Sequence, residues 1–348
     1  MILVDFSNLI HRILFVSVKN TSPSILEYKG MFLHMLFNNL KTIKTEFSPV
    51  YGDIVLCLDD QKSWRKDFYP AYKGDRAKKR DDSAIDFKEF YKLIDDTLEK
   101  ITEFFPFKVV KASKAEGDDV IACIVKNRGN GDKCLIVTED KDMRQLRHYP
   151  NVDIYKPINK VWDTSSMSEI DSWILEHLLV GDSIDNIPSI KKETEFSKKF
   201  IKHMQSYGIY ETDVYRFFKL AISKKILEEY SEVDKKGKLD VYKPALFGEV
   251  KAREFAKDLK GNIYQNKLWI RNFVRNRKLI MFKYIPKDIE FGILESFDSA
   301  KSNYDGMKIM NYFVENKLKY LAEGAQDFFI ETNSSEDLGD AKFDDWFV

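Results

Sequence analysis

Apolar runs of strand length alternate with stretches of helical periodicity through the first half of the chain. Runs typical of strands stand at Ile2–Val4, Asp53–Leu58, Phe107–Val110, Lys133–Val137 and Val152–Tyr155. Apolar residues at helical spacing stand between them, at Met31–Phe47, Phe87–Phe105 and Glu116–Arg128. Because almost wholly apolar strands that alternate with helices are typical of buried parallel sheets, we expect a three-layer α/β core with a mainly parallel sheet.

Helical periodicity dominates the second half of the chain, where the strand signal fades after about residue 168. Helices are expected at Glu169–Leu179, Glu193–Gln205, Glu211–Tyr230, Val250–Leu259, Lys267–Phe282 and near Gly306–Leu321. We therefore expect the α/β core to occupy residues 1–180 and a mainly helical region to occupy residues 181–330. A polar segment, residues 331–348, follows as a tail.

The composition excludes several classes of protein. The 348 residues are 44% hydrophobic and 14% aromatic, which is enough to bury a sizeable core and excludes a disordered chain. No apolar run approaches the roughly 18 to 20 residues of a membrane span, and the N-terminus lacks the basic segment of a signal peptide. Cys57, Cys123 and Cys134 lie in apolar contexts without zinc-site spacing, which indicates reduced thiols. We expect a cytoplasmic monomer that binds no membrane.

The formal net charge is zero, with 56 basic and 56 acidic residues, but the charges are unevenly distributed. Residues 61–80 hold eight bases and two acids, whereas residues 331–348 hold six acids and one base. The neutrality is therefore a cancellation between a basic segment and an acidic tail, and it does not argue against binding to nucleic acid.

Acidic residues follow the predicted strands where each strand ends. Asp5 follows the first strand, Asp59 follows the second, and Glu139-Asp140-Lys141-Asp142 follows the fourth. Two further acidic clusters are Glu116-Gly117-Asp118-Asp119 and Gly181-Asp182-Ser183-Ile184-Asp185. Because the carboxyl ends of parallel strands meet at one edge of the sheet, we expect these carboxylates to converge there.

Crowded carboxylates repel one another and need a compensating cation. Oxygen ligands without nearby histidine or cysteine favour Mg²⁺, with Mn²⁺ as a substitute. Such a site, with two or more ions about 3.5 to 4 Å apart, is typical of phosphodiester hydrolysis, where the metals activate a water and stabilise the leaving oxygen.

A structural alternative remains for each acid, because acidic residues after strands are also common helix N-caps. Ser113-Lys114-Ala115-Glu116 fits a capping box, with Glu116 at its fourth position. Capping accounts for one acid at a helix start, however, and not for three acids within four residues.

The order of these acidic motifs resembles the 5′-nuclease, or flap endonuclease, family, and the spacing is most similar to its phage ribonuclease H members. The resemblance covers roughly residues 1–190 and weakens toward residue 320. It implies a PIN-like nuclease core, divalent-metal catalysis and substrates with 5′ ends or flaps, in host cytoplasm for a phage protein. The metal ligands it implies are Asp5, Asp59, Glu116, Asp118, Asp119, Asp140, Asp142, Asp185 and, less directly, Asp182.

A basic and aromatic segment, residues 61–82, follows the second strand directly. Such segments can pair with phosphates and stack on unpaired bases, although a solvated charged helix is the structural alternative. The segment resembles the arch of the family, which implies that Lys73 and Arg76 contact the scissile or adjacent phosphate and that Arg65 and Tyr72 contact the threaded strand. The other expected DNA-binding residues here are Lys66, Tyr69, Lys78, Lys79 and Arg80.

Two further segments are candidates for binding. Many relatives continue after the Asp185 motif with a Gly-rich hairpin, whereas this chain has lysines that could contact DNA directly or form a solvated helix face: Lys191, Lys192, Lys198 and Lys199. The acidic tail carries Phe343, Trp346 and Phe347. Apolar side chains among acids suggest a docking peptide for a sliding clamp or a single-strand-binding protein, or a tail that folds back on its own core.

The sequence thus predicts a structure-specific 5′-nuclease that removes RNA primers and 5′ flaps during DNA replication and acts on DNA and RNA/DNA hybrids. The alternative is a non-catalytic protein that binds replication forks and docks on a clamp or single-strand-binding protein. That alternative gives no reason for five carboxylate clusters. No P-loop or GxSxG motif supports a different enzyme class.

Overall fold

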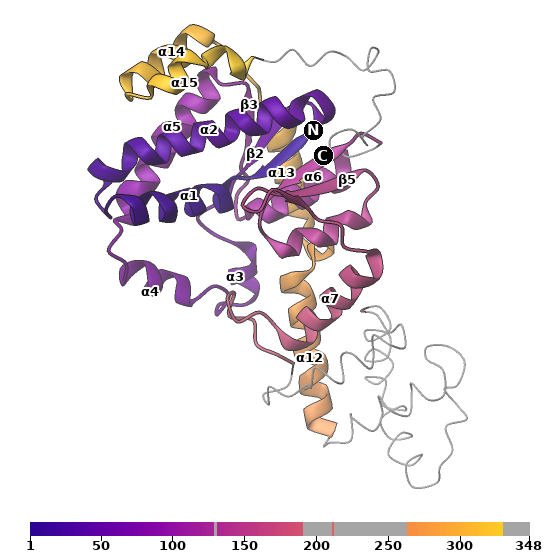
Figure 1. Ribbon diagram of the computed structural model, residues 1–348. Coiled ribbons are helices and arrows are strands. Elements are labelled where there is room, and N and C mark those ends of the chain that lie inside the picture. The colour runs from indigo at the N-terminus through magenta and orange to yellow at the C-terminus, as the bar shows by residue number, and fades with distance from the viewer. Residues whose placement is uncertain (129–130, 191–210, 212–262, 330–348) are drawn as a thin grey trace, which may run out of the picture. The chain divides into compact units, whose positions relative to one another are not determined.

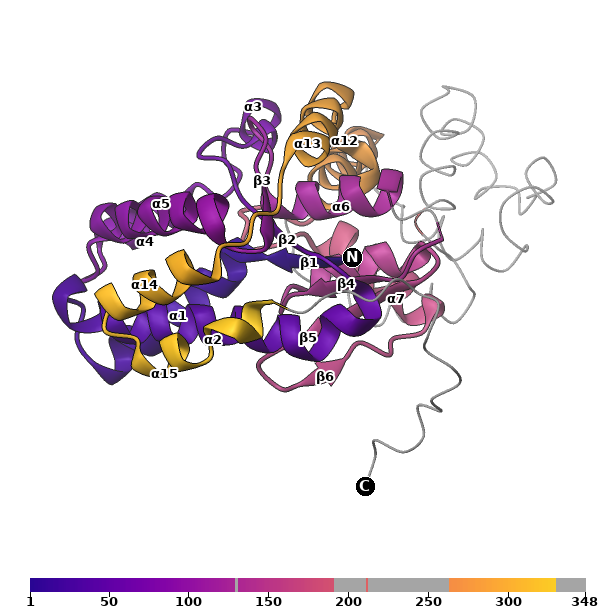
Figure 2. The same cartoon turned by 90° about the horizontal axis from the view of Figure 1, so that it is seen from above.

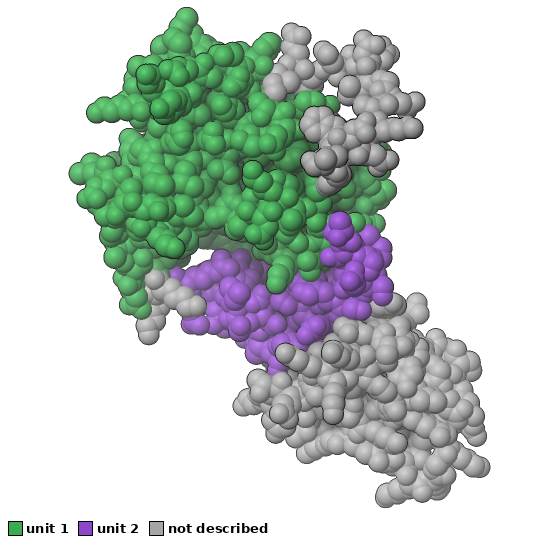
Figure 3. Space-filling view, viewed as in Figure 1, with its two compact units in different colours: residues 1–63, 79–163, 287–348 green, residues 64–78, 164–286 purple. Residues whose placement is uncertain are grey.

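The computed structural model describes residues 1–128, 131–190, 211 and 263–329. The chain divides into two compact units, which are coloured separately in Figure 3. The first unit comprises residues 1–63, 79–163 and 287–348, and the second comprises residues 64–78 and 164–286. Each unit is described by itself.

A sheet forms the centre of the first unit (Figure 1). In the described residues it has six strands in the order β3-β2-β1-β4-β5-β6. The strands are β1 (Ile2–Asp5), β2 (Ile54–Cys57), β3 (Phe107–Val110), β4 (Cys134–Val137), β5 (Val152–Lys156) and β6 (Val161–Trp162). The first five pair in parallel and β6 pairs antiparallel with β5, so the prediction of a mainly parallel sheet is confirmed.

Helices cover both faces of this sheet (Figure 2). One face packs on α1 (Phe6–Asn20), α2 (Ile25–Tyr51) and α5 (Phe87–Phe104), and the core between them is rich in aromatic rings such as Phe32, Phe37 and Phe105. On the other face, α6 (Gly117–Arg128) contacts β1 and β2, and α13 (Lys287–Ser299) contacts α6 and β3. The helices α14 (Gly306–Glu315) and α15 (Lys319–Glu323) and the 3-10 turn η3 (Ala325–Phe328) extend the aromatic core.

The second unit is helical where it is described. It contains α3 (Trp64–Phe68), α7 (Met167–Val180), α12 (Ile263–Ile280) and the 3-10 turn η2 (Phe282–Tyr284). A capping box between Ser166 and Glu169 begins α7, and Gly181 ends it. The side chain of Asn276, which is fully buried, donates to the carbonyl oxygens of Leu178 and Pro188 and so joins α12 to α7 and the loop after it.

The structure adds elements that the periodicity did not predict. These are α1, α3, α13, β6 and α4 (Asp75–Asp81), and the helix expected near Gly306–Leu321 is divided into α14 and α15. The helices expected over residues 193–205 and 250–259, and most of the one expected over 211–230, lie outside the described residues. None of the described helices combines the length and apolar character that crossing a membrane requires.

Candidate metal centre and basic arch

The carboxyl ends of β1, β2 and β4 bring three of the predicted acids into one electrostatic neighbourhood. Asp5 is the last residue of β1, Asp59 follows β2, and Asp140 begins the 3-10 helix η1 (Lys141–His148) after β4. Thr138 joins two of them, because its hydroxyl donates to Asp5 Oδ2 at 2.7 Å and accepts from the Asp140 amide at 2.9 Å. Hydrogen bonds through Thr138 therefore connect Asp5 to the start of η1 at this edge of the sheet.

The charge of Asp5 is poorly compensated in this site. The carboxyl is 5% exposed, and burial raises its pKa from 3.8 to about 7. Hydrogen bonds from the Asn8 amide and the Thr138 hydroxyl lower the pKa, whereas the charges of Asp59 and Asp140 raise it further. A cation at this edge would therefore remove an unfavourable interaction among the three carboxylates.

The N-terminus of α6 brings further acids beside β2. The Gly117 amide donates to Asp59 Oδ1 at 2.6 Å, and Asp119, which is fully buried, accepts from the Glu116 amide at 3.1 Å. Asp118, at the same helix start, and Asp5 both raise the pKa of the buried Cys57 thiol, although burial is the larger cause.

Helix N-capping, the structural alternative for the acids, is correct for two of them. Asp5 Oδ1 caps α1 by accepting from the Asn8 amide, and Asp140 Oδ1 caps η1 by accepting from the Asp142 amide. The expected capping box was wrong, because α6 begins at Gly117 and it is Asp119 that reaches back to the Glu116 amide. Each capping oxygen retains a second lone pair, so a cap and a metal ligand are compatible roles.

These residues fit a hydrated divalent ion. Within the described residues, no group of three acidic, histidine or cysteine side chains is arranged to hold one metal ion. Mg²⁺ keeps several of its waters and uses one or two carboxylates in such sites, so pairs of acids suffice. The donor set consists of carboxylates at or just after strand ends, and the raised pKa of Asp5 shows that its charged form would gain from a nearby cation, so the set is suited to that ion.

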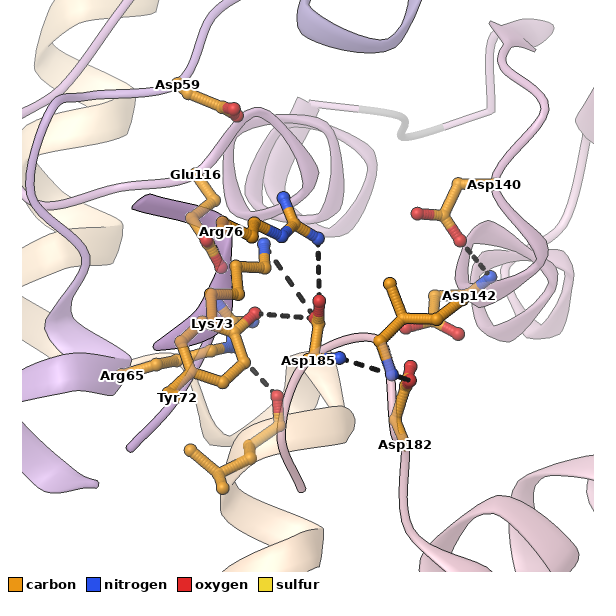
Figure 4. Close-up of polar contacts among 12 residues, drawn as sticks. Asp59, Arg65, Tyr72, Lys73, Arg76, Glu116, Asp140, Asp142, Asp182 and Asp185 are labelled. Carbon is orange, nitrogen blue, oxygen red and sulfur yellow. Dashed lines mark hydrogen bonds and ion pairs between the residues drawn. The ribbon is translucent and has the colours of Figure 1, made fainter. Parts of the chain in front are cut away.

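In the second unit, three arch residues converge on Asp185 (Figure 4). Arg76 donates to Asp185 Oδ1 at 2.7 Å, the Tyr72 hydroxyl donates to Oδ2 at 3.1 Å, and Lys73 Nζ lies 3.8 Å from Oδ2. The Lys73 amide also donates to the Asp185 carbonyl oxygen at 2.9 Å. The expected phosphate-binding bases thus contact an expected metal ligand.

The other arch residues differ in exposure. Arg65 is 3% exposed, lies over the Trp64 ring and donates to the Leu279 carbonyl oxygen on α12. Tyr72 is 3% exposed, and Lys66 is exposed. Arg65 and Tyr72 therefore pack within the unit, and their contact with a threaded strand stays a prediction.

The remaining expected DNA-binding residues are placed in part. Arg275 lies over the Tyr69 ring in the second unit, and in the first unit Arg80 donates to the Tyr91 hydroxyl. The side chains of Lys78 and Lys79 lie outside the described part of the chain. So do these predicted residues: Lys191, Lys192, Lys198, Lys199, Phe343, Trp346 and Phe347.

Asp182 stabilises the loop that presents Asp185. Its Oδ1 accepts from the Ile184 amide at 2.7 Å and from the Asp185 amide at 3.3 Å. A hydrogen bond from His177 lowers the pKa of Asp182. Gly181 has φ +80°, and a Cβ there would lie 2.3 Å from the Ile187 carbonyl oxygen, so the loop requires glycine.

Comparison with known proteins identifies the chain's relatives as nucleases. A family model described as the 5′-3′ exonuclease, N-terminal resolvase-like domain, matches residues 1–173, and one described as T4 RNase H, C terminal, matches residues 251–328. The chain belongs to the 5′-nuclease family. It is a metal-dependent nuclease with the PIN-like fold that its sequence predicted.

Individual relatives of this 5′-nuclease are also nucleases. It is 29% identical to the ribonuclease H of Enterobacteria phage T4 over 332 residues, which are 94% of this chain and 95% of the relative. It is 26% identical to the 5′-3′ exonuclease of Aquifex aeolicus over 67% of this chain and 82% of the relative. A solved bacteriophage T5 flap endonuclease, in a complex with DNA and metal ions, has a TM-score of 0.54 at 16% identity and covers 86% of this chain and 99% of its own. That likeness shows the fold.

Sequence reasoning missed two residues of this 5′-nuclease that organise its acids. Thr138 directly follows the fourth predicted strand and precedes Glu139, and a hydroxyl between an apolar strand and an acidic cluster was the available signal. Gly117 separates Glu116 from Asp118, and a Cβ there would lie 3.1 Å from Asp59 Oδ1 and 3.2 Å from the Cys57 carbonyl oxygen. Glycine therefore allows α6 to begin against the end of β2.

Proposed function

We propose that this 5′-nuclease removes RNA primers and 5′ flaps during DNA replication, with Mg²⁺ as its metal and with Mn²⁺ as a substitute. The observation that supports the proposal is that Asp5 ends β1 and Asp59 and Asp140 follow β2 and β4, where burial and like charge raise the pKa of Asp5 to about 7. The T4 ribonuclease H and the T5 flap endonuclease, which are similar to this chain, support the substrate class.

The chain's own residues would hold and orient the reacting groups. Asp5, Asp59 and Asp140 would hold the metal, together with the other predicted acids Glu116, Asp118, Asp119, Asp142, Asp182 and Asp185. When bound, divalent ions lower the pKa of water and neutralise charge on a phosphodiester. Thr138 fixes the Asp5 carboxylate, and the Gly117 amide fixes Asp59, so both acids are oriented before substrate binds.

Lys73 and Arg76 would contact the phosphate that is cut or its neighbour. Lys73 lies on the turn between α3 and α4, whereas Arg76 lies in the first turn of α4 and is 49% exposed. Their charge would stabilise the negative charge that develops in the transition state. The other arch bases and the lysines of residues 191–199 would contact the strand and the duplex.

The acidic tail would bind a replication partner. Phe343, Trp346 and Phe347 would supply apolar contacts to a sliding clamp or a single-strand-binding protein. Recovery of purified clamp by the full chain, and its loss with a chain that ends at residue 332, would support this part of the proposal. Equal recovery by both chains would contradict it.

Cleavage of defined substrates tests the catalytic proposal. A 5′-labelled DNA flap and an RNA/DNA hybrid are incubated with the full chain at matched ionic strength, with Mg²⁺ and with EDTA. We expect short 5′ products with Mg²⁺ and none with EDTA. Absence of cleavage on both substrates with Mg²⁺ and with Mn²⁺ would refute the proposal.

Neutralised acids separate catalysis from fork binding. Asp140→Asn and Asp142→Asn should abolish cleavage while flap binding in EDTA, measured by fluorescence anisotropy, stays within about twofold of the unchanged chain, because the metal ligands supply reactivity more than duplex affinity. Glu139→Gln is the matched control, since Glu139 instead accepts from the Ile158 amide and pairs with Arg12. A fork-binding protein without catalysis would show no cleavage before any substitution.

A further inference from the structure

Asp185 is surrounded by arch donors in the structure. One carboxylate oxygen accepts a hydrogen bond from Arg76 and the other accepts one from the Tyr72 hydroxyl. Lys73 forms an ion pair with the same carboxylate. The carboxylate is 17% exposed and Lys73 is 15% exposed, so these charges interact partly away from water. Hydrogen bonds to charged groups in such settings are stronger than neutral ones.

The backbone around these contacts is also constrained. Lys73 has φ +51° and Asn186 has φ +57°, a left-handed conformation that costs non-glycine residues free energy unless the surroundings hold it. The Asp185 carbonyl oxygen accepts from the Lys73 amide, and the Asn186 side chain donates to Asp75 Oδ2 at 2.8 Å. The arch turn and the Asp185 loop therefore hold each other in shape.

A counter-ion is needed where Lys73 and Arg76 lie side by side. Two cations that face the same point repel each other, and the Asp185 carboxylate offsets that repulsion. A phosphate oxygen carries similar charge and accepts from the same donors. A phosphate could thus take the place of the carboxylate without a change in the positions of the two bases.

We propose that Asp185 is a positioning residue for the arch: before nucleic acid binds, it holds Tyr72, Lys73 and Arg76 in the arrangement in which the two bases receive a phosphate. This role is additional to any part of Asp185 in metal binding and operates without metal. The roles of Lys73 and Arg76 toward phosphate rest on the proposed function, whereas the positioning itself does not.

Hydrogen exchange in the metal-free, DNA-free full chain tests the proposal. Asp185→Asn should accelerate amide exchange across residues 72–76 by about tenfold, because a charge-assisted anchor is lost. Asp140→Asn is the matched control: it neutralises a predicted metal ligand of the other unit and should leave exchange at residues 72–76 within about twofold of the unchanged chain. Exchange at residues 72–76 that is unchanged in Asp185→Asn, or raised equally by Asp140→Asn, overturns the proposal.

Tyr72→Phe keeps the test decisive if Asp185→Asn unfolds, and a double variant sharpens the test if Asp185→Asn folds. Tyr72→Phe removes one hydroxyl donor and should accelerate exchange at residues 72–76 by about threefold. In an Arg76→Ala background, adding Asp185→Asn should have a smaller effect than it has alone, since the two residues share one interaction. Fully additive effects would overturn the proposal. Cleavage is not measured in these experiments, so failure of the proposed function would leave their outcome intact, and the reverse also holds.

Discussion

Glu290 on α13 joins the C-terminal helices to the helix that carries Asp118 and Asp119. Its side chain is 8% exposed and accepts from Lys126 at 2.8 Å, Asn127 at 2.9 Å and Lys287 at 2.9 Å. Burial alone would raise the pKa of Glu290, but the hydrogen bonds from Lys126, Lys287 and Asn127 outweigh it and lower the pKa from 4.5 to about 2. We predict that Glu290→Gln destabilises the first unit at neutral pH.

The size of the effect follows from that pKa. A fall from 4.5 to about 2 corresponds to about 3 kcal/mol of folding free energy, at about 1.4 kcal/mol for each tenfold change in proton affinity. Lys126 is 39% exposed and Lys287 is 84% exposed, so water screens part of this attraction. We therefore expect Glu290→Gln to cost about 1 to 2 kcal/mol at pH 7.

The pH dependence of the stability difference identifies the Glu290 charge as its cause. Because the pKa is lower in the folded state, the stabilisation is complete above about pH 4.5 and declines as the pH falls toward about 2. Glutamine does not titrate, so the difference between the two chains should fall by about half between pH 7 and pH 3.

Urea unfolding followed by circular dichroism measures this difference at each pH. Glu295→Gln is the matched control, because Glu295 is exposed on the same helix, and it should change stability by less than about 0.5 kcal/mol. A Glu290→Gln loss that equals the control, or one that stays constant from pH 7 to pH 3, would refute the reasoning.

Three further substitutions test the site. Thr138→Val removes the hydroxyl that joins Asp5 to the Asp140 amide and should lower the single-turnover cleavage rate by about 10- to 100-fold. An unchanged rate would show that Thr138 only fills space. Lys73→Ala should slow single-turnover cleavage far more than it weakens duplex binding in EDTA, and an unchanged rate would remove Lys73 from the reaction. Gly181→Ala should cost at least about 2 kcal/mol in urea unfolding, because its Cβ would contact the Ile187 carbonyl oxygen, and wild-type stability would show that the loop can relax.

The acidic motifs show how far sequence reasoning reaches. Asp5, Asp59 and Asp140 were predicted to meet because each follows a parallel strand, and in the structure the charges of Asp59 and Asp140 raise the pKa of Asp5. The helix α1 was missed, although its buried residues, among them Leu9, Ile10 and Ile13, recur at helical spacing.

The roles of single side chains were less accessible from sequence. Arg65 and Tyr72 have the composition of a strand-binding segment, yet both are 3% exposed. Asp185 matches a metal-ligand motif, yet its oxygens accept from arch residues more than a hundred positions earlier in the chain. Such pairings depend on how distant segments fold together, which spacing along the chain does not record.

The sequence by itself determined the parallel α/β core, the order of the acidic motifs and the family to which they belong, because these depend on local periodicity and on residues at strand ends. Only the tertiary structure decided that Thr138 connects Asp5 to Asp140, that Gly117 lets α6 start against Asp59, and that Asp185 is the counter-ion of the arch. The physical reason is that hydrogen bonds and charge pairing depend on distances and directions in space.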